Sequence, residues 1–163
     1  MTQPTMRQSE PVGTLSRVVI VQAPPDVAWR VFTEQMGTWW PLATHKIGRA
    51  PAVDTLMEPR VGGRWYERGE DGSTCDWGRV LVWEPPARLV LAWQISADWQ
   101  YDSALQTEVE VRFQAQGKGT RVELEHRGLD RYGMRQEEMQ RLFASERGWA
   151  GLLASFARAA EQQ

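Results

Sequence analysis

The sequence predicts an α+β fold in which a curved antiparallel sheet of six or seven strands wraps a long C-terminal helix. Three observations favour it. Short β-branched or alternating segments fill most of the chain between residues 53 and 127, short turns join them, and one amphipathic helical pattern ends the chain. Consecutive strands joined by short turns favour an antiparallel meander over βαβ units. A strongly curved sheet and one helix do not close a core completely, which leaves room for an apolar cavity.

The first predicted elements are a strand and two short helices. Residues 15–22 are rich in β-branched side chains and predict a strand. Pro25 and Asp26 suit the first turn of a helix, because proline fixes a helical φ and a carboxylate is favourable at the positive helix end. Apolar residues at helical spacing extend this helix to Glu34, and residues 36–42 predict a second short helical piece.

The middle of the chain alternates between strand patterns and turn residues. The predicted strands cover residues 53–58, 64–68, 74–84, 88–95, 105–115 and 120–127. The last two alternate between apolar and charged side chains, so they predict a hairpin with one core face and one solvated face. Gly78 interrupts the long strand over residues 74–84 and predicts a bulge or a bend there.

A helical pattern closes the chain. Apolar residues recur at spacings of three and four from Met139 to Ala157, which predicts one long amphipathic helix. Gly148 lies inside this pattern, where a glycine costs about 1 kcal/mol relative to alanine. It therefore indicates a kink, or a close approach between the helix and the sheet.

Composition narrows the class of protein. The length of 163 residues suits one domain, which we expect to cover residues 14–163 after a disordered lead over residues 1–13. A formal net charge of −2 gives no overall attraction to nucleic acid or to an anionic membrane, and no apolar run approaches the ~18 residues of a spanning helix. Cys75 is the single cysteine and the N-terminus lacks an apolar signal-peptide stretch, so we expect a cytoplasmic protein.

Several short segments occur in the order found in one superfamily. They are residues 23–29 (APPDVAW), the Trp39–Trp40 pair, residues 60–65 (RVGGRW), residues 78–89 with a double proline, residues 119–122 (GTRV), and Gly148–Trp149 followed by Leu152 and Leu153. With these segments the sequence resembles the helix-grip superfamily, which includes START domains and polyketide cyclases. Within it, the sequence is similar to the branch of the C-terminal domain of the activator of the heat-shock-protein-90 ATPase.

The resemblance implies a helix-grip fold with an apolar cavity. It does not imply one activity, because the superfamily contains binding proteins, enzymes and co-chaperones. The co-chaperone that names the branch has an additional N-terminal domain for which this chain has no room, and this counts against a chaperone partner.

The residues that could carry function are those able to face the cavity. We find no phosphate-binding glycine loop, nucleophile elbow, paired-cysteine zinc motif or zinc-protease helix motif, so we expect neither a cofactor nor a metal. The nine tryptophans indicate a core of large rings or a cavity lined with them. The cavity candidates are Trp39, Trp40, Trp65, Glu67, Trp77, Arg79, Trp83, Trp93, His126, Phe143 and Trp149.

Each polar candidate has two interpretations. His126 either acts on a ligand as a base or donor, or is a strand-end histidine bonded to backbone and partly solvated. Glu67 and Arg79 alternate with tryptophans, so they either pair across neighbouring strands or lie at a wet end of the sheet. His45 either contacts a ligand at the cavity mouth or is exposed, and Glu146 either reaches the cavity or meets solvent.

Three functions follow from these interpretations. The leading one is binding of a small apolar or aromatic molecule. The second is a cyclase, aromatase or hydrolase in which His126, Glu67 or Tyr132 lies within ~3 Å of a reacting atom. The third is a module that contacts a heat-shock chaperone, which predicts an exposed apolar patch larger than a few hundred Å².

Overall fold

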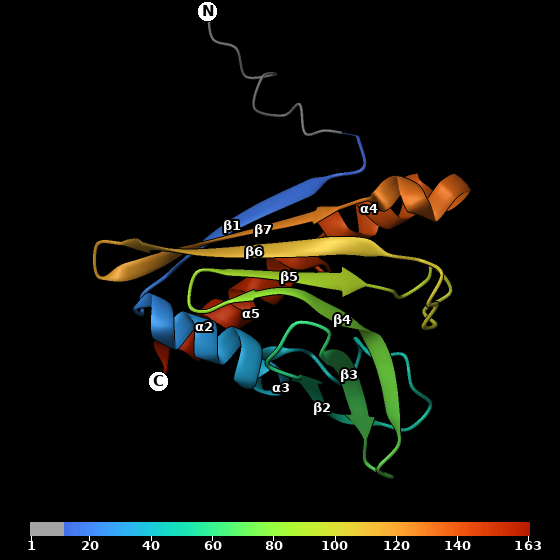
Figure 1. Ribbon diagram of the computed structural model, residues 1–163, viewed down its shortest axis with the longest axis horizontal. Helices are drawn as coiled ribbons and strands as arrows, with labels where there is room; N and C mark the ends of the chain where they lie inside the picture. The colour runs from blue at the N-terminus through green and yellow to red at the C-terminus, as the bar shows by residue number, and fades with distance from the viewer. Residues whose placement is uncertain (1–11) are drawn as a thin grey trace, which may run out of the picture.

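The structure of the protein, a computed structural model, describes residues 12–163. Its framework is one seven-stranded sheet in the order β1-β7-β6-β5-β4-β3-β2, with every neighbouring pair antiparallel (Figure 1). The strands are β1 (Leu15–Val21), β2 (Ala52–Met57), β3 (Arg64–Gly69), β4 (Thr74–Glu84), β5 (Arg88–Trp93), β6 (Thr107–Gln116) and β7 (Gly119–Arg127). The predicted antiparallel meander is therefore confirmed, with seven strands.

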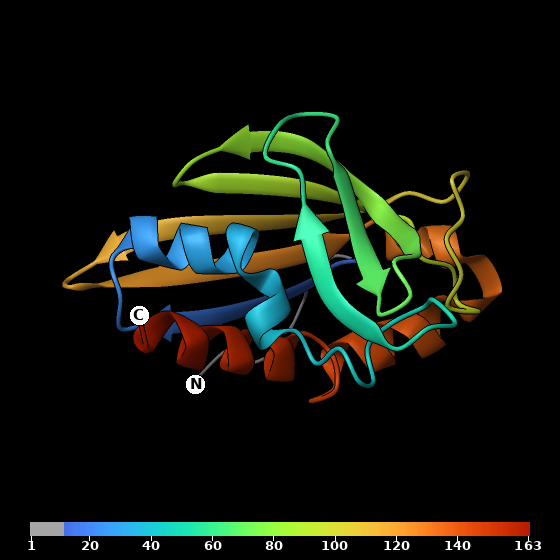
Figure 2. The same cartoon turned by 90° about the horizontal axis from the view of Figure 1, so that it is seen from below.

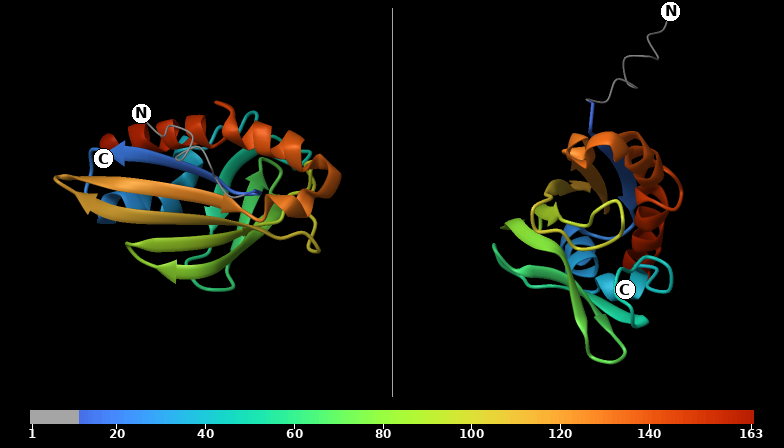
Figure 3. Two further views of the ribbon diagram at one scale, coloured as in Figure 1. Left: turned by 90° about the horizontal axis from the view of Figure 1, so that it is seen from above. Right: turned by 90° about the vertical axis from the view of Figure 1, so that its right-hand side faces the viewer.

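Five helical segments accompany the sheet within the described residues. They are α2 (Pro25–Glu34), α3 (Met36–Trp39), the 3-10 segment η1 (Leu129–Arg135), α4 (Gln136–Ala144) and α5 (Trp149–Glu161). The sheet curls into a half-barrel, and α2, α3 and α5 lie along its inner side (Figures 2 and 3). The predicted helix-grip architecture is confirmed.

The inner and outer faces of β6 and β7 follow the predicted alternation. Val111, Phe113 and Leu124 point inward and are buried. On the outer face, burial acts to raise the pKa of Glu110, but hydrogen bonds from arginines of β5, β6 and β7 outweigh it and lower the pKa to about 2. The solvated face of this hairpin is thus an ordered network of ion pairs.

The C-terminal helix is bent rather than continuous. It ends as α4 at Ala144 and begins again as α5 at Trp149, and Gly148 precedes α5 (Figure 3). A Cβ atom at Gly148 would lie 2.2 Å from the carbonyl oxygen of Phe143, so any larger residue would push the two segments apart. The kink expected at this glycine is confirmed, and the absence of a side chain at Gly148 lets the two helix segments meet closely there.

Two β-bulges in β4 place Arg79 on the opposite face of the sheet from the one predicted. The pairing with β3 skips Trp77, and the pairing with β5 skips Leu81. Each extra residue resets the alternation of side chains. Trp77 is consequently buried while Arg79, two residues later, is exposed, so the expectation that they share the inner face is wrong.

Some expectations fall on residues with no described structure. The predicted disordered lead, residues 1–13, lies outside the described residues except for Val12 and Gly13, which form a turn. No helix within residues 12–163 has the length and apolar character needed to cross a membrane.

Candidate functional site

A cavity of about 480 Å³ opens where the bend of the C-terminal helix faces β4, β5 and the loop after α3. Its size falls in the range of about 300–1,000 Å³ that is usual for small-molecule sites. The residues that line it are Trp40, Thr44, His45, Lys46, Ile47, Trp77, Trp93, Ile95, Trp99, Leu142, Phe143, Arg147, Gly148, Trp149 and Leu152.

The walls of the cavity are mainly indole rings in edge-on or tilted contact. Trp40 is the centre of this wall, with ring-centroid distances of 5.2 Å to Trp77 and 6.1 Å to Trp149. Trp93 contacts Trp149 at 5.8 Å and the ring of Phe143 at 5.4 Å. Edge-to-face packing fixes the rings against one another, so the cavity has rigid, flat, apolar walls before any ligand enters.

Glu67 holds the mouth loop in place from behind. Its carboxylate is buried and accepts hydrogen bonds from the backbone N–H of Ile47 (2.7 Å), the backbone N–H of Gly48 (3.0 Å) and the indole of Trp77 (2.8 Å). Arg79 plays no part, so the predicted pairing of Glu67 with Arg79 is wrong. The carboxylate joins β3, β4 and the loop that carries His45 and Lys46.

His126 lies in the core behind the cavity wall. It is fully buried, so the expectation of a partly solvated strand-end histidine is wrong. The indole N–H of Trp149 donates to Nδ1 (3.1 Å), which leaves Nε2 to donate to the hydroxyl of Thr107 (2.8 Å), and that hydroxyl donates to the carbonyl of Trp93. Burial lowers the pKa of His126 to about 3, so the ring is neutral and its two nitrogens are occupied.

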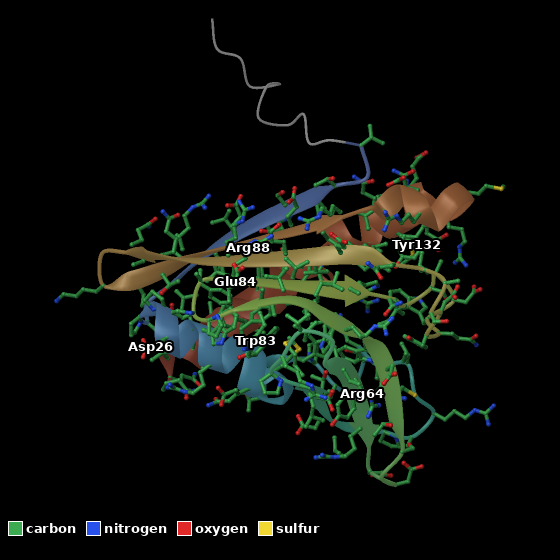
Figure 4. All side chains as sticks on the ribbon, viewed as in Figure 1. Asp26, Arg64, Trp83, Glu84, Arg88 and Tyr132 are labelled. Carbon is green, nitrogen blue, oxygen red and sulfur yellow. The ribbon has the colours of Figure 1, made fainter. Side chains whose placement is uncertain are left out.

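Tyr132 is also committed to an internal hydrogen bond. Its hydroxyl donates to the carbonyl oxygen of Ile95 (2.7 Å), and it lies at the α4 end of the molecule (Figure 4). Burial raises the pKa of this phenol, and the N–H of Trp93 partly offsets that effect. This indole N–H is itself buried and has no hydrogen-bond partner among the described residues.

The polar lining is concentrated at the cavity mouth. His45 bridges its two sides, because Nε2 donates to the carbonyl oxygen of Arg147 (2.7 Å) and Nδ1 accepts from the hydroxyl of Thr44 (2.8 Å). Trp99 stands at the rim, 40% exposed, with a φ of 61° that side-chain-bearing residues rarely adopt.

The structure separates the predicted cavity residues into two groups. Five of them line the cavity: Trp40, Trp77, Trp93, Phe143 and Trp149. Trp39 and Trp65 are core residues whose indoles donate to Val31 O and Met36 Sδ, and Trp83 packs against Trp29 of α2 (Figure 4). Glu67 and His126 support the site from outside its lining, while Arg79 and Glu146 are exposed.

Sequence reasoning missed several lining residues, among them Lys46, Trp99 and Arg147. All three lie in loops or helix breaks, where no periodicity indicates a side-chain direction. The sequence offered one signal for each: Lys46 follows His45, Trp99 lies in an aromatic loop, and Arg147 precedes Gly148. Among residues 12–163, no group of three or more His, Cys, Asp or Glu side chains could hold a metal ion.

The chain is similar to known proteins in both sequence and fold. A sequence profile described as "Activator of Hsp90 ATPase homolog 1-like protein" matches residues 22–161. The chain belongs to this family. No protein of curated function matches the chain. Whether this family member contacts a chaperone stays a prediction.

Solved structures extend the similarity. The anthrahydroquino-gamma-pyrone synthase Txn09 is 36% identical over 90% of this chain and 96% of its own, with a TM-score of 0.64. The self-sacrificing resistance protein CalC from Micromonospora echinospora is 30% identical, over 93% of this chain and 96% of its own, with a TM-score of 0.68. Protein NE0264 from Nitrosomonas europaea, at 17% identity, a TM-score of 0.67 and coverage of 94% and 97%, shares the fold. The expected resemblance to polyketide-cyclase-type helix-grip proteins is confirmed.

Proposed function

We propose that the protein binds a small, planar aromatic molecule in the cavity. The observation that carries this proposal is the cavity of about 480 Å³, whose lining includes five indoles, with Trp99 at the rim among them, and a phenylalanine ring. Flat rings stack on indoles or meet them edge-on, and both arrangements are favourable beyond the apolar area that they bury. The wall is fixed by its own ring contacts, so a ligand would meet a site that is largely formed in advance.

The relatives support a ligand of this class. Txn09 is named as a synthase of an anthrahydroquino-gamma-pyrone, which is a fused aromatic ring system. This similarity covers 90% of this chain and 96% of Txn09.

The test fills the cavity without removing its walls. Leu142 is a partly exposed lining residue, so Leu142→Trp would occupy the cavity rather than the core. Val18→Trp, on the outer side of β1 and 47% exposed, is the matched control. Calorimetric titration with a flavonoid and with anthracene-2-carboxamide should show saturable binding to the native protein and to Val18→Trp, and none to Leu142→Trp. Equal binding to all three proteins, or binding to none, would refute the proposal.

A second candidate function is catalysis on such a molecule. The 36% identity with a synthase favours it. Acid–base chemistry would fall to His45 or Lys46, because these side chains line the cavity whereas His126, Glu67 and Tyr132 do not. Incubation with aromatic polyketides followed by mass spectrometry would detect a product. His45→Gln should then abolish turnover while leaving ligand binding intact, and unchanged turnover would remove His45 from the chemistry.

A further inference from the structure

The charge of the cavity mouth differs from that of the protein as a whole. The chain carries a formal net charge of −2, yet the cavity lining contains two cations, Lys46 and Arg147, and no carboxylate. The cations come from opposite sides of the mouth, because Lys46 belongs to the loop after α3 and Arg147 to the break between α4 and α5. The bond from His45 to the carbonyl of Arg147 holds the two sides together.

Neither cation is neutralised by the described part of the chain. Lys46 donates only to the carbonyl oxygen of Gly48 (2.6 Å), and the guanidinium of Arg147 makes no hydrogen bond or ion pair within residues 12–163. Most arginines of the outer sheet face, by contrast, are paired with carboxylates at 2.6–3.5 Å. The two mouth cations therefore have no ion-pair partner within the described residues and can pair with an incoming anion.

The acidic residues near the mouth are committed elsewhere. The carboxylate of Glu67 lies behind the mouth loop, where it accepts hydrogen bonds from three N–H donors. Asp98, in the loop that carries Trp99, pairs with Arg135 at 2.7 Å, and Asp102 accepts from the backbone N–H of Ala104. Glu146 is exposed and does not line the cavity. No carboxylate lines the cavity, although Glu67 and Asp76 lie near enough to act together with Lys46 on the thiol of Cys75.

The start of α5 adds to the same field. Gly148, at the N-cap of α5, and Trp149, its first residue, line the cavity, and no side chain caps this helix end. The free N–H groups of a helix start attract negative charge. Apolar walls with a low dielectric constant strengthen the field of charges at a cleft mouth. Two unpaired cations and a helix start thus act together at one end of an indole-lined cavity.

We infer that the ligand is an aromatic acid: a planar ring system that lies against the indoles, with an ionised carboxylate or phenolate held at the mouth by Lys46 and Arg147. This inference rests on the proposed function and specifies its ligand class. The acid faces the mouth because an anion among the indoles would lose its hydration without a partner.

The test compares two probes of the same shape and different charge. Anthracene-2-carboxylate should bind about tenfold more tightly than anthracene-2-carboxamide, which corresponds to about 1.4 kcal/mol. Added salt should weaken binding of the acid and leave the amide unaffected, because salt screens a charge pair at a solvent-exposed mouth. Calorimetry measures both affinities.

Variants assign the preference to the two cations. The double change Lys46→Met and Arg147→Met keeps the alkyl stems and should reduce the affinity for the acid to that for the amide, with amide binding unchanged. Lys118→Met with Arg158→Met removes the same charge from exposed positions outside the cavity and should preserve the preference. The exchange Lys46→Arg with Arg147→Lys should preserve it too.

The outcomes separate the two proposals. Equal affinity for acid and amide in the native protein, or a preference that survives loss of both mouth cations, would overturn the aromatic acid while leaving an aromatic-binding protein. Binding of neither probe would overturn the proposed function, and the inference about the acid would fall with it.

Discussion

Replacing the buried carboxylate of Glu67 by its amide tests how the mouth loop is held. In Glu67→Gln the amide oxygen can take the place of Oε1 and keep the bonds from Ile47 N and Trp77 Nε1. The NH₂ group then faces the N–H of Gly48, which leaves two buried donors without acceptors. Each such donor costs about 1–3 kcal/mol, so we expect a loss of about 3 kcal/mol in the free energy of unfolding.

Two measurements check this expectation. Urea denaturation gives the change in stability, and hydrogen exchange gives the local opening of the mouth loop, where the amide of Gly48 should lose protection first. Glu70→Gln removes the same charge from an exposed residue and should change stability by less than about 0.5 kcal/mol. If both variants unfolded at the same urea concentration, the carboxylate would not anchor the loop as described.

Two further predictions concern the sheet and the core. Gly78→Ala should lower the free energy of unfolding by about 3 kcal/mol, as measured by urea denaturation, because the new Cβ would lie 1.7 Å from the backbone oxygen of Ala92. Gly117→Ala, where the Cβ would meet open space but φ is positive, should lower it by about 1 kcal/mol. An unchanged midpoint for Gly78→Ala would contradict that close approach. In the folded protein His126 stays neutral down to about pH 3, whereas in the unfolded chain it is protonated below about pH 6.5. The free energy of unfolding should therefore decrease as the pH is lowered from 6.5 to 3, by up to about 1.4 kcal/mol per pH unit. Glu110, with a folded pKa of about 2, should add a further loss of stability below pH 4.5. If the urea denaturation curve did not shift between pH 6 and pH 4, His126 would not be held neutral in the folded protein as described.

The order of elements was predictable because each has a local signature. Pro25 and Asp26 do begin α2, and the strict alternation of β6 and β7 gives their inner and outer faces. The bend at Gly148 was indicated by a glycine within a helical pattern. These features depend on neighbouring residues in the chain, which a sequence displays directly.

The site was less predictable because it depends on irregular backbone. The bulge at Trp77 shifts the alternation, so a period of two placed Arg79 on the wrong face. The burial of His126 depends on an indole of α5, 23 residues away, which no local pattern reveals. Lys46 and Arg147 lie outside helices and strands, where no side-chain periodicity exists, and only the folded chain brings them together at the mouth of the cavity.

The pairing of β1 with β7 has a consequence for how the chain is made. Leu15 lies opposite His126, so β1 leaves the ribosome about 110 residues before β7, its neighbour in the sheet that residues 12–163 form, exists. At ordinary rates of translation that interval lasts several seconds, during which Val18, Val19 and Ile20 have no strand beside them. The half-barrel is therefore completed only once β7 has been synthesised, and the edge of β1 stays unpaired until then.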